Sequence, residues 1–88
     1  MWVKSMPYKA TLSHLPSELD LILADVIAEL DKASATHGPF PTALHGLAVL
    51  EEEVDEFKYE VRHGTKERRY AEAIQVSAMA IRFLIDCQ

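Results

Sequence analysis

The feature that most constrains the fold is a helical stretch near the C-terminus, residues 66–86, which is apolar around most of its circumference. At about 100° per residue, only a narrow polar stripe remains, and it contains Glu72, Gln75, Arg82 and Asp86. A helix that is apolar nearly all round must be buried nearly all round. Two further helices in a chain of 88 residues can hardly cover it. The pattern therefore predicts a homo-oligomer, either a homodimer or a homotetramer.

Two other helical patterns precede this stretch, and we read residues 1–15 as an N-terminal arm. The range 42–63 has Thr42 as a candidate N-cap and is followed by Gly64, a residue typical of helix ends. The range 16–37 has apolar residues at helical spacing, which predicts one buried stripe formed by Leu19, Ile22, Leu23, Val26, Ile27 and Leu30. The sequence thus predicts one all-α domain over residues 1–88, an antiparallel helical bundle completed by homo-oligomerisation.

Charge and cysteine content narrow the possible partners and the compartment. The net charge of −5 argues against nucleic acid as the main partner, because such binders cluster cationic side chains. No apolar run approaches membrane-spanning length, so we expect no membrane partner. The single cysteine, Cys87, provides no internal disulfide, and we therefore expect a cytoplasmic location.

The predicted helix 42–63 separates an apolar face from an acidic face. Apolar side chains between Leu47 and Val61 share one side of the helix. Six carboxylates fall within ten positions, at Glu51, Glu52, Glu53, Asp55, Glu56 and Glu60. By itself such a run is typical of a solvated helix face.

The short turn before residues 66–86 gives this acidic face a partner. Helices joined by a short turn are antiparallel neighbours, and a turn centred on Gly64 places Glu56 level with Glu72 and Glu53 level with Gln75. Three carboxylates and one amide oxygen then converge between two helices. Oxygen ligands of this kind suit a hard divalent cation such as Mg²⁺, which commonly bridges to substrate phosphates. Glu51, Asp55 and Glu60 are expected to be solvated instead.

The only basic cluster in the chain lies around the same turn. It either offsets the acidic helix or binds phosphate, from the same or a neighbouring subunit. Its members are Arg62, Lys66, Arg68 and Arg69, and Lys58 on the preceding helix is a further candidate for phosphate binding.

Arg82 and the histidines are expected to have structural roles. Arg82 and Asp86 are spaced i, i+4 on an otherwise apolar helix, which predicts a structural ion pair. We interpret His37, His45 and His63 as loop and helix-end residues, because no histidine pair has a zinc-like set of partners.

The acidic residues also carry a resemblance to a known family. Residues 52–56, Glu-Glu-Val-Asp-Glu, match EExxE, and after fifteen residues Glu72-Ala73-Ile74-Gln75 stands where ExxD is expected. Over roughly His37 to Asp86 the chain resembles the MazG-like, all-α nucleoside triphosphate pyrophosphohydrolases, in particular small bacterial or mobile-element members.

The resemblance implies Mg²⁺-dependent hydrolysis of a nucleoside or deoxynucleoside triphosphate to the monophosphate and pyrophosphate. It implies that Glu53, Glu56, Glu72 and Gln75 hold the metal, and that Glu52 is a further ligand or orients the attacking water. Glu52, Glu53 and Glu56 are then the catalytic residues. The chain departs from the pattern at Gln75, because an amide oxygen binds Mg²⁺ without contributing charge.

Two other functions fit the same residues. The first is a catalytically degenerate MazG-like module that binds a nucleotide or a protein, with Gln75 marking the lost activity. The second is a helical regulator whose acidic face docks a basic partner.

Overall fold

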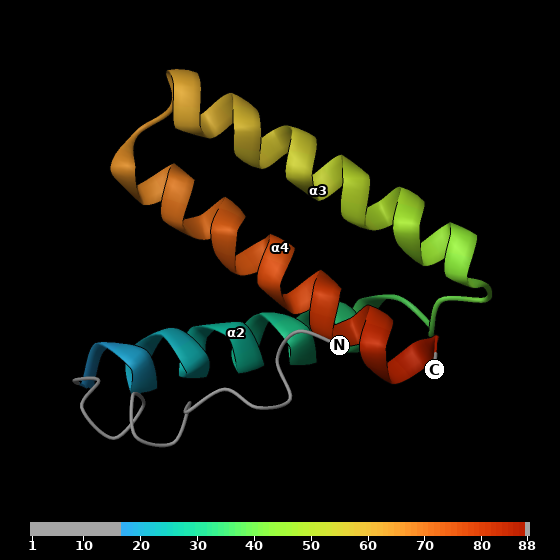
Figure 1. Cartoon of the computed structure of the whole chain (residues 1–88). Coiled ribbons are helices and arrows are strands. Elements are labelled where there is room, and N and C mark those ends of the chain that lie inside the picture. Colours follow the sequence, from blue (N-terminus) through green and yellow to red (C-terminus); the bar gives the residue numbers. More distant parts are fainter. Residues whose placement is uncertain (1–16, 88) are drawn as a thin grey trace, which may run out of the picture.

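The computed structural model describes residues 17–87, and every regular element in that range is an α-helix. The helices are α2 (Ser17–Thr36), α3 (Ala43–His63) and α4 (Lys66–Asp86) (Figure 1). Each end lies within one residue of the range predicted from the sequence. The predicted arm, residues 1–15, lies outside the described residues. Among helices α2 to α4, none combines the length and the apolar content needed to cross a membrane.

Local capping fixes the hairpin formed by α3 and α4. The hydroxyl of Thr42 accepts a hydrogen bond from the amide of His45 at 3.0 Å, which confirms Thr42 as the N-cap of α3. The amide of Gly64 donates to the carbonyl of Glu60 at 2.8 Å and ends that helix. Thr65 then caps α4 in the same way as Thr42 caps α3. Because the turn is so short, the two helices return side by side and antiparallel (Figure 1).

The second helix of this hairpin, α4, is the centre of the fold. Both α2 and α3 pack against α4, whereas α2 and α3 do not pack against each other. The buried core follows the line where α2 and the linker after it meet α4, and consists of Val26, Ala33, Phe40, Ile74, Ala78 and Met79. Because α2 and α3 pack on different sides of α4, a cavity remains between α2, the linker and the hairpin; it is described with the metal centre below.

A buried arginine fastens the linker between α2 and α3 to α4. Arg82 is 5% exposed, and its guanidinium donates to the backbone carbonyls of His37 and Gly38. The same group lies 4.5 Å from the centre of the Phe40 ring and 3.6 Å from the Asp86 carboxylate. Asp86 in turn accepts a hydrogen bond from the amide of Phe40. The predicted ion pair between Arg82 and Asp86 is confirmed, and it also anchors the linker.

Much of the predicted apolar stripe of α2 is not buried by this chain. Of its members, Val26 is buried, but Ile22, Leu23 and Ile27 are exposed, and Ile27 is 65% exposed. The single chain covers the stripe only in part because α2 meets one neighbour, α4, along a narrow line. The prediction is of a stripe buried in a bundle completed by homo-oligomerisation, so it stays a prediction. The other helices have the same property, with exposed apolar side chains that include Leu44, Leu47, Val61, Leu84 and Ile85.

Candidate metal centre

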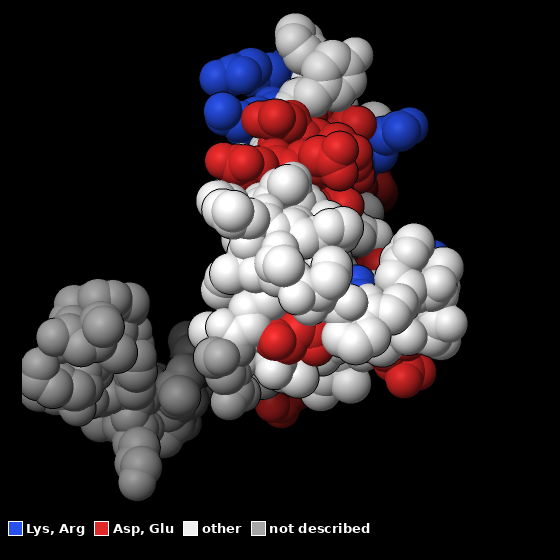
Figure 2. Space-filling model, turned by 90° about the vertical axis from the view of Figure 1, so that its right-hand side faces the viewer, with Lys and Arg blue, Asp and Glu red and all other residues white. Residues whose placement is uncertain are grey.

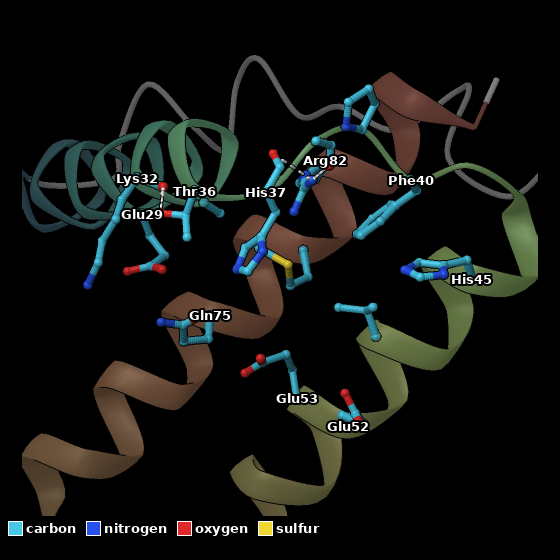
Figure 3. A pocket seen from close by; sticks show the side chains of 15 residues that line it. Glu29, Lys32, Thr36, His37, Phe40, His45, Glu52, Glu53, Gln75 and Arg82 are labelled. Carbon is cyan, nitrogen blue, oxygen red and sulfur yellow. Dashed lines mark hydrogen bonds between the residues drawn. The ribbon is translucent and has the colours of Figure 1, made fainter.

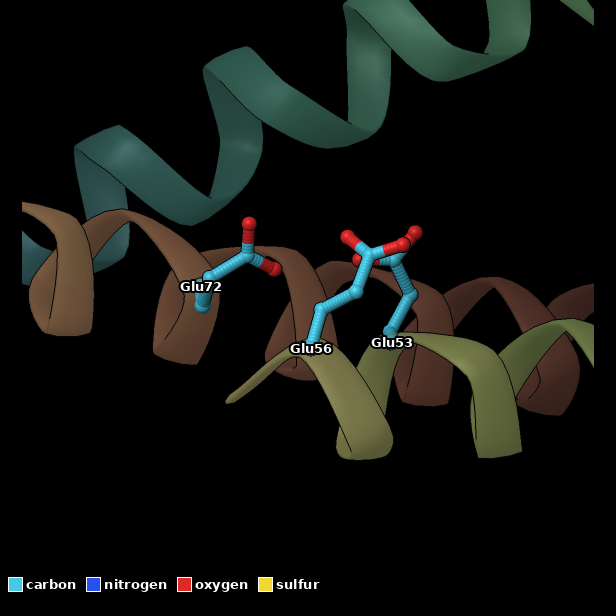
Figure 4. Close-up of side chains that lie close together, drawn as sticks. All are labelled: Glu53, Glu56 and Glu72. Atoms are coloured by element: carbon cyan, nitrogen blue, oxygen red, sulfur yellow. The ribbon is translucent and has the colours of Figure 1, made fainter. Parts of the chain in front are cut away.

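Three glutamates from the two helices of the hairpin meet at one point. Glu53 and Glu56 lie one turn apart on α3, and Glu72 faces them from α4 (Figure 4). One carboxylate oxygen from each residue can be chosen so that all three oxygens lie within 4.8 Å of one another. We call these residues the carboxylate cluster. The hairpin register inferred from the sequence already placed Glu56 opposite Glu72, and the cluster follows from that register together with the i, i+3 spacing on α3.

The electrostatics of the cluster favour protonation of Glu53. Burial is the largest cause, followed by the charges of Glu56 and Glu72, a hydrogen bond to Glu72 and the charge of Glu29. Together they raise the pKa of Glu53 from 4.5 to about 7. Near neutral pH, a substantial fraction of Glu53 side chains is therefore protonated and neutral, and the rest carry a negative charge that Glu56 and Glu72 repel.

Glu72 is also in an unfavourable environment for a bare carboxylate. Burial, then the charges of Glu56 and Glu60, raise its pKa, while the hydrogen bond with Glu53 and the charge of Arg68 act in the opposite direction. With its neighbours ionised, Oε1 of Glu72 is buried and has no hydrogen-bond partner among the described residues. A buried acceptor without a partner is costly, so a proton or a cation at this point would stabilise the fold.

The raised pKa of Glu53 predicts how stability depends on pH when no metal is present. Between pH 4.5 and about 7 the folded chain binds more protons at Glu53 than the unfolded chain does. The free energy of unfolding should therefore fall as pH rises through this window, and the loss should be complete above it. Urea unfolding in EDTA at pH 5 and pH 8 measures the change.

Two variants assign that pH dependence to the cluster. Glu53→Gln should lose most of the difference between pH 5 and pH 8, because its side chain does not titrate. Glu51→Gln should retain the difference, since Glu51 is exposed and lies outside the cluster. A wild-type chain that is equally stable at both pH values, or more stable at pH 8, would contradict the assigned pKa.

A cavity of about 500 Å³ adjoins the cluster, between α2, the linker and the hairpin (Figure 3). We call it the α2 cavity. Glu52, Glu53 and Gln75 line it from α3 and α4, and they come from the set predicted to bind metal or to act in catalysis. Glu53 belongs to both the cluster and the cavity, so a molecule in the cavity can contact the Glu53 carboxylate directly. Glu56 and Glu72 line a separate groove.

Sequence reasoning missed the residues that α2 and the linker bring to this cavity. Glu29 and Lys32 line it from α2, and His37, Phe40 and His45 line it from the linker and the start of α3. Their i, i+3 spacing places Glu29 and Lys32 on one side of α2, but nothing in that spacing shows which helix they face.

None of the five residues predicted to bind phosphate lines the α2 cavity. Lys58 lies 4.0 Å from Asp55, and Arg68 lies 3.4 Å from Glu60. Arg68 also lines a shallow groove with Glu56 and Glu72, outside the α2 cavity. The remaining three, Arg62, Lys66 and Arg69, line neither the α2 cavity nor the shallow groove.

The expectation that Glu60 is solvated is wrong. Its side chain is 13% exposed, packs beside Gly64 and pairs with Arg68. The turn before α4 folds Arg68 back over the last part of α3, which covers Glu60. Glu51 and Asp55 are exposed as expected.

The charged surface shows where these residues gather. Figure 2 shows Asp and Glu side chains in a dense group toward the hairpin end, with Lys and Arg beside them, and a mainly uncharged surface below. Comparison of the chain with known proteins found no matching family model, no matching curated protein and no matching solved structure. The functional interpretation therefore depends on the residues themselves.

Proposed function

We propose that this protein is a Mg²⁺-dependent pyrophosphohydrolase that converts a nucleoside or deoxynucleoside triphosphate to the monophosphate and pyrophosphate. The observation that carries the proposal is the convergence of Glu53, Glu56 and Glu72 beside a cavity large enough for part of a nucleotide. The MazG-like resemblance supplies the reaction class.

The donor atoms of the cluster fit a hard cation. All three are carboxylate oxygens, the ligand type that Mg²⁺ prefers. The buried, unpaired Oε1 of Glu72 and the raised pKa of Glu53 mark carboxylates that a positive charge would stabilise. Glu53, Glu56 and Glu72 would hold the ion, and a bound Mg²⁺ would supply positive charge beside the phosphates and activate water.

Other residues that line the cavity could accept a proton from water, contact the substrate and neutralise its charge. Glu52 is exposed and lines the cavity one residue before Glu53, where its carboxylate can accept a proton from the attacking water. His45 is exposed and presents a flat ring to the part of the substrate beyond the phosphates, and its ring centre lies 6.1 Å from that of the buried Phe40. Lys32 is a cation in the same cavity and suits the negative charge of the substrate.

A second candidate is a degenerate relative that binds a nucleotide or a protein without turnover. The observation that favours it is the neutral side chain of Gln75 beside Glu53 in the cavity wall. It predicts stabilisation by nucleotides without release of pyrophosphate.

The proposal includes self-association. Exposed apolar side chains on all three helices, among them Leu21, Leu44 and Leu84, support a second copy as their cover. Sedimentation as a single copy at micromolar concentration would contradict this part of the proposal.

A screen of nucleoside triphosphates for pyrophosphate release tests the activity. With Mg²⁺ we expect equal amounts of monophosphate and pyrophosphate from at least one substrate, and no release in EDTA because the carboxylates alone cannot offset the phosphate charge. Turnover that is equal with and without EDTA would contradict the metal mechanism. Nucleotide-dependent stabilisation without turnover would favour the degenerate relative.

A further inference from the structure

The α2 cavity has apolar lining from all three helices. Ala33 comes from α2, Val49 from α3 and Met79 from α4. Ala33 and Met79 belong to the buried core, and Val49 packs against it. The volume of about 500 Å³ lies within the range of small-molecule sites, which combine an apolar lining with a few polar groups. A flat apolar ligand in this cavity would therefore extend the core of the protein.

Gln75 contributes the only side-chain amide of that lining. It is half-buried and lies one turn before Met79 on α4. Within residues 17–87 its side chain makes no hydrogen bond. A side-chain amide offers a donor beside an acceptor and carries no charge. Gln75 is therefore suited to a neutral group that presents the complementary pair.

The position of Gln75 separates it from most of the carboxylate cluster. Glu56 and Glu72 line the shallow groove, whereas Gln75 lines the α2 cavity. Of the three clustered glutamates, only Glu53 lines that cavity as well. A carboxylate in place of Gln75 would only accept hydrogen bonds, so the neutral amide suits the uncharged edge of a ligand better.

A histidine of the linker faces the same cavity. His37 is exposed, and Figure 3 shows it projecting, like Gln75, into the space between α2 and the hairpin. The buried Arg82 donates to the carbonyl of His37, which holds the backbone that carries the ring. Histidine is one of the side chains on which nucleobases stack. The cavity thus combines a ring, an apolar lining and an amide.

We propose that the α2 cavity binds the nucleobase of the substrate, with the Gln75 amide hydrogen-bonded to the edge of the base. This inference rests on the proposed function, because the base belongs to the same nucleotide. A nucleobase fits because it has flat faces that stack and an edge that carries donors and acceptors. Its faces contact Met79 and the His37 ring, and the phosphates extend toward Glu53. Gln75, where the chain departs from the ExxD pattern, then recognises the base instead of the metal.

Nuclear magnetic resonance of the isotope-labelled full chain tests this contact directly. The sequence has no asparagine and two glutamines, Gln75 and Gln88, so the signals that disappear in Gln75→Leu identify the Gln75 amide. In EDTA, at least one of adenosine, guanosine, cytidine and uridine should shift these signals saturably. Ribose, which has no base, should leave them unchanged. No shift with any of the nucleosides at millimolar concentration, or an equal shift with ribose, would overturn the inference.

Two substitutions measure what the amide and the ring contribute to nucleoside affinity, followed by the backbone amide signals. Gln75→Leu should weaken the tightest nucleoside by at least about 5-fold, because a paired donor and acceptor contact is lost. His37→Ala should weaken it by at least about 5-fold through lost stacking, and His37 is exposed, so the fold is kept. His63→Ala is the matched control, since His63 is exposed and outside the α2 cavity. Wild-type affinity in both Gln75→Leu and His37→Ala would contradict the proposed contacts.

The inference and the proposed function fail in different ways. If triphosphates release pyrophosphate in Mg²⁺ while no nucleoside shifts the Gln75 signals, the base lies elsewhere and the proposed activity stands. If Mg²⁺ alone shifts these signals and nucleosides do not, Gln75 is a metal ligand and the inference is wrong. If nucleosides shift them while no triphosphate releases pyrophosphate, the hydrolase proposal is wrong and the base site stands.

Discussion

Replacing Glu53 by Gln is expected to lower the rate of pyrophosphate release by at least about 100-fold. Glu53 takes part in both the carboxylate cluster and the α2 cavity, so its loss removes a cation ligand at the point where substrate and ion meet. Glu56→Gln should have a similar effect, because Glu56 faces the same point. The comparison is made under conditions of substrate excess, with pyrophosphate as the readout.

Glu51→Gln serves as the control for these variants. It removes the same charge from α3, two residues from Glu53, but Glu51 is exposed and outside both the cluster and the cavity. Its rate should stay close to that of the wild type. An equal loss in Glu51→Gln would mean that the total charge of α3, and not the cluster, controls the activity.

Replacing Arg82 by Met is expected to lower the free energy of unfolding by about 3–5 kcal/mol, the range for removing one member of a buried ion pair. The change leaves the Asp86 carboxylate without its cation and two linker carbonyls, of His37 and Gly38, without their donor. It also removes the cation from the face of the Phe40 ring. Urea unfolding of wild type and variant measures the loss.

The control for Arg82 is an arginine without these contacts. Arg62→Met should change the free energy of unfolding by less than about 0.5 kcal/mol, because Arg62 is exposed and has no ion pair among the described residues. Asp86→Asn combined with Arg82→Met should cost less than the sum of the two single changes, since both belong to one network. A loss below about 0.5 kcal/mol for Arg82→Met would show that the linker does not depend on this contact.

The hairpin and its cluster could be predicted from the sequence because they depend on neighbouring residues. Thr42 and Gly64 mark the ends of α3, and a short turn forces the next helix to return antiparallel. Once the hairpin is accepted, the approach of Glu72 to Glu56 follows from counting residues.

The side of the α2 cavity that α2 contributes could not be predicted by counting residues along the chain. Its position depends on the path of the linker, which is held by bonds from Arg82 to backbone carbonyls of His37 and Gly38. Backbone carbonyls leave no mark in the sequence, so the spacing of Glu29 and Lys32 gave no sign that both face the cavity.

How much of α2 a single chain buries could not be predicted for a related reason. The periodic pattern of α2 correctly indicates which side is apolar, but it does not tell which neighbour covers that side. Val26 lies on the contact line with α4, whereas Ile27 lies beside it and stays exposed. The burial of the Glu60 side chain was not predicted because it depends on the contact that Arg68 makes with it across the turn.

The central claim is that Glu53, Glu56 and Glu72 form a divalent-cation site, and calorimetric titration of the wild-type chain with Mg²⁺ at pH 8 tests it most directly. At this pH Glu53 is mainly ionised, because its pKa is about 7. We predict saturable binding with one ion per site, lost in Glu72→Gln and retained in Glu51→Gln. Absence of saturable binding, or the same binding in Glu72→Gln as in the wild type, would contradict the account.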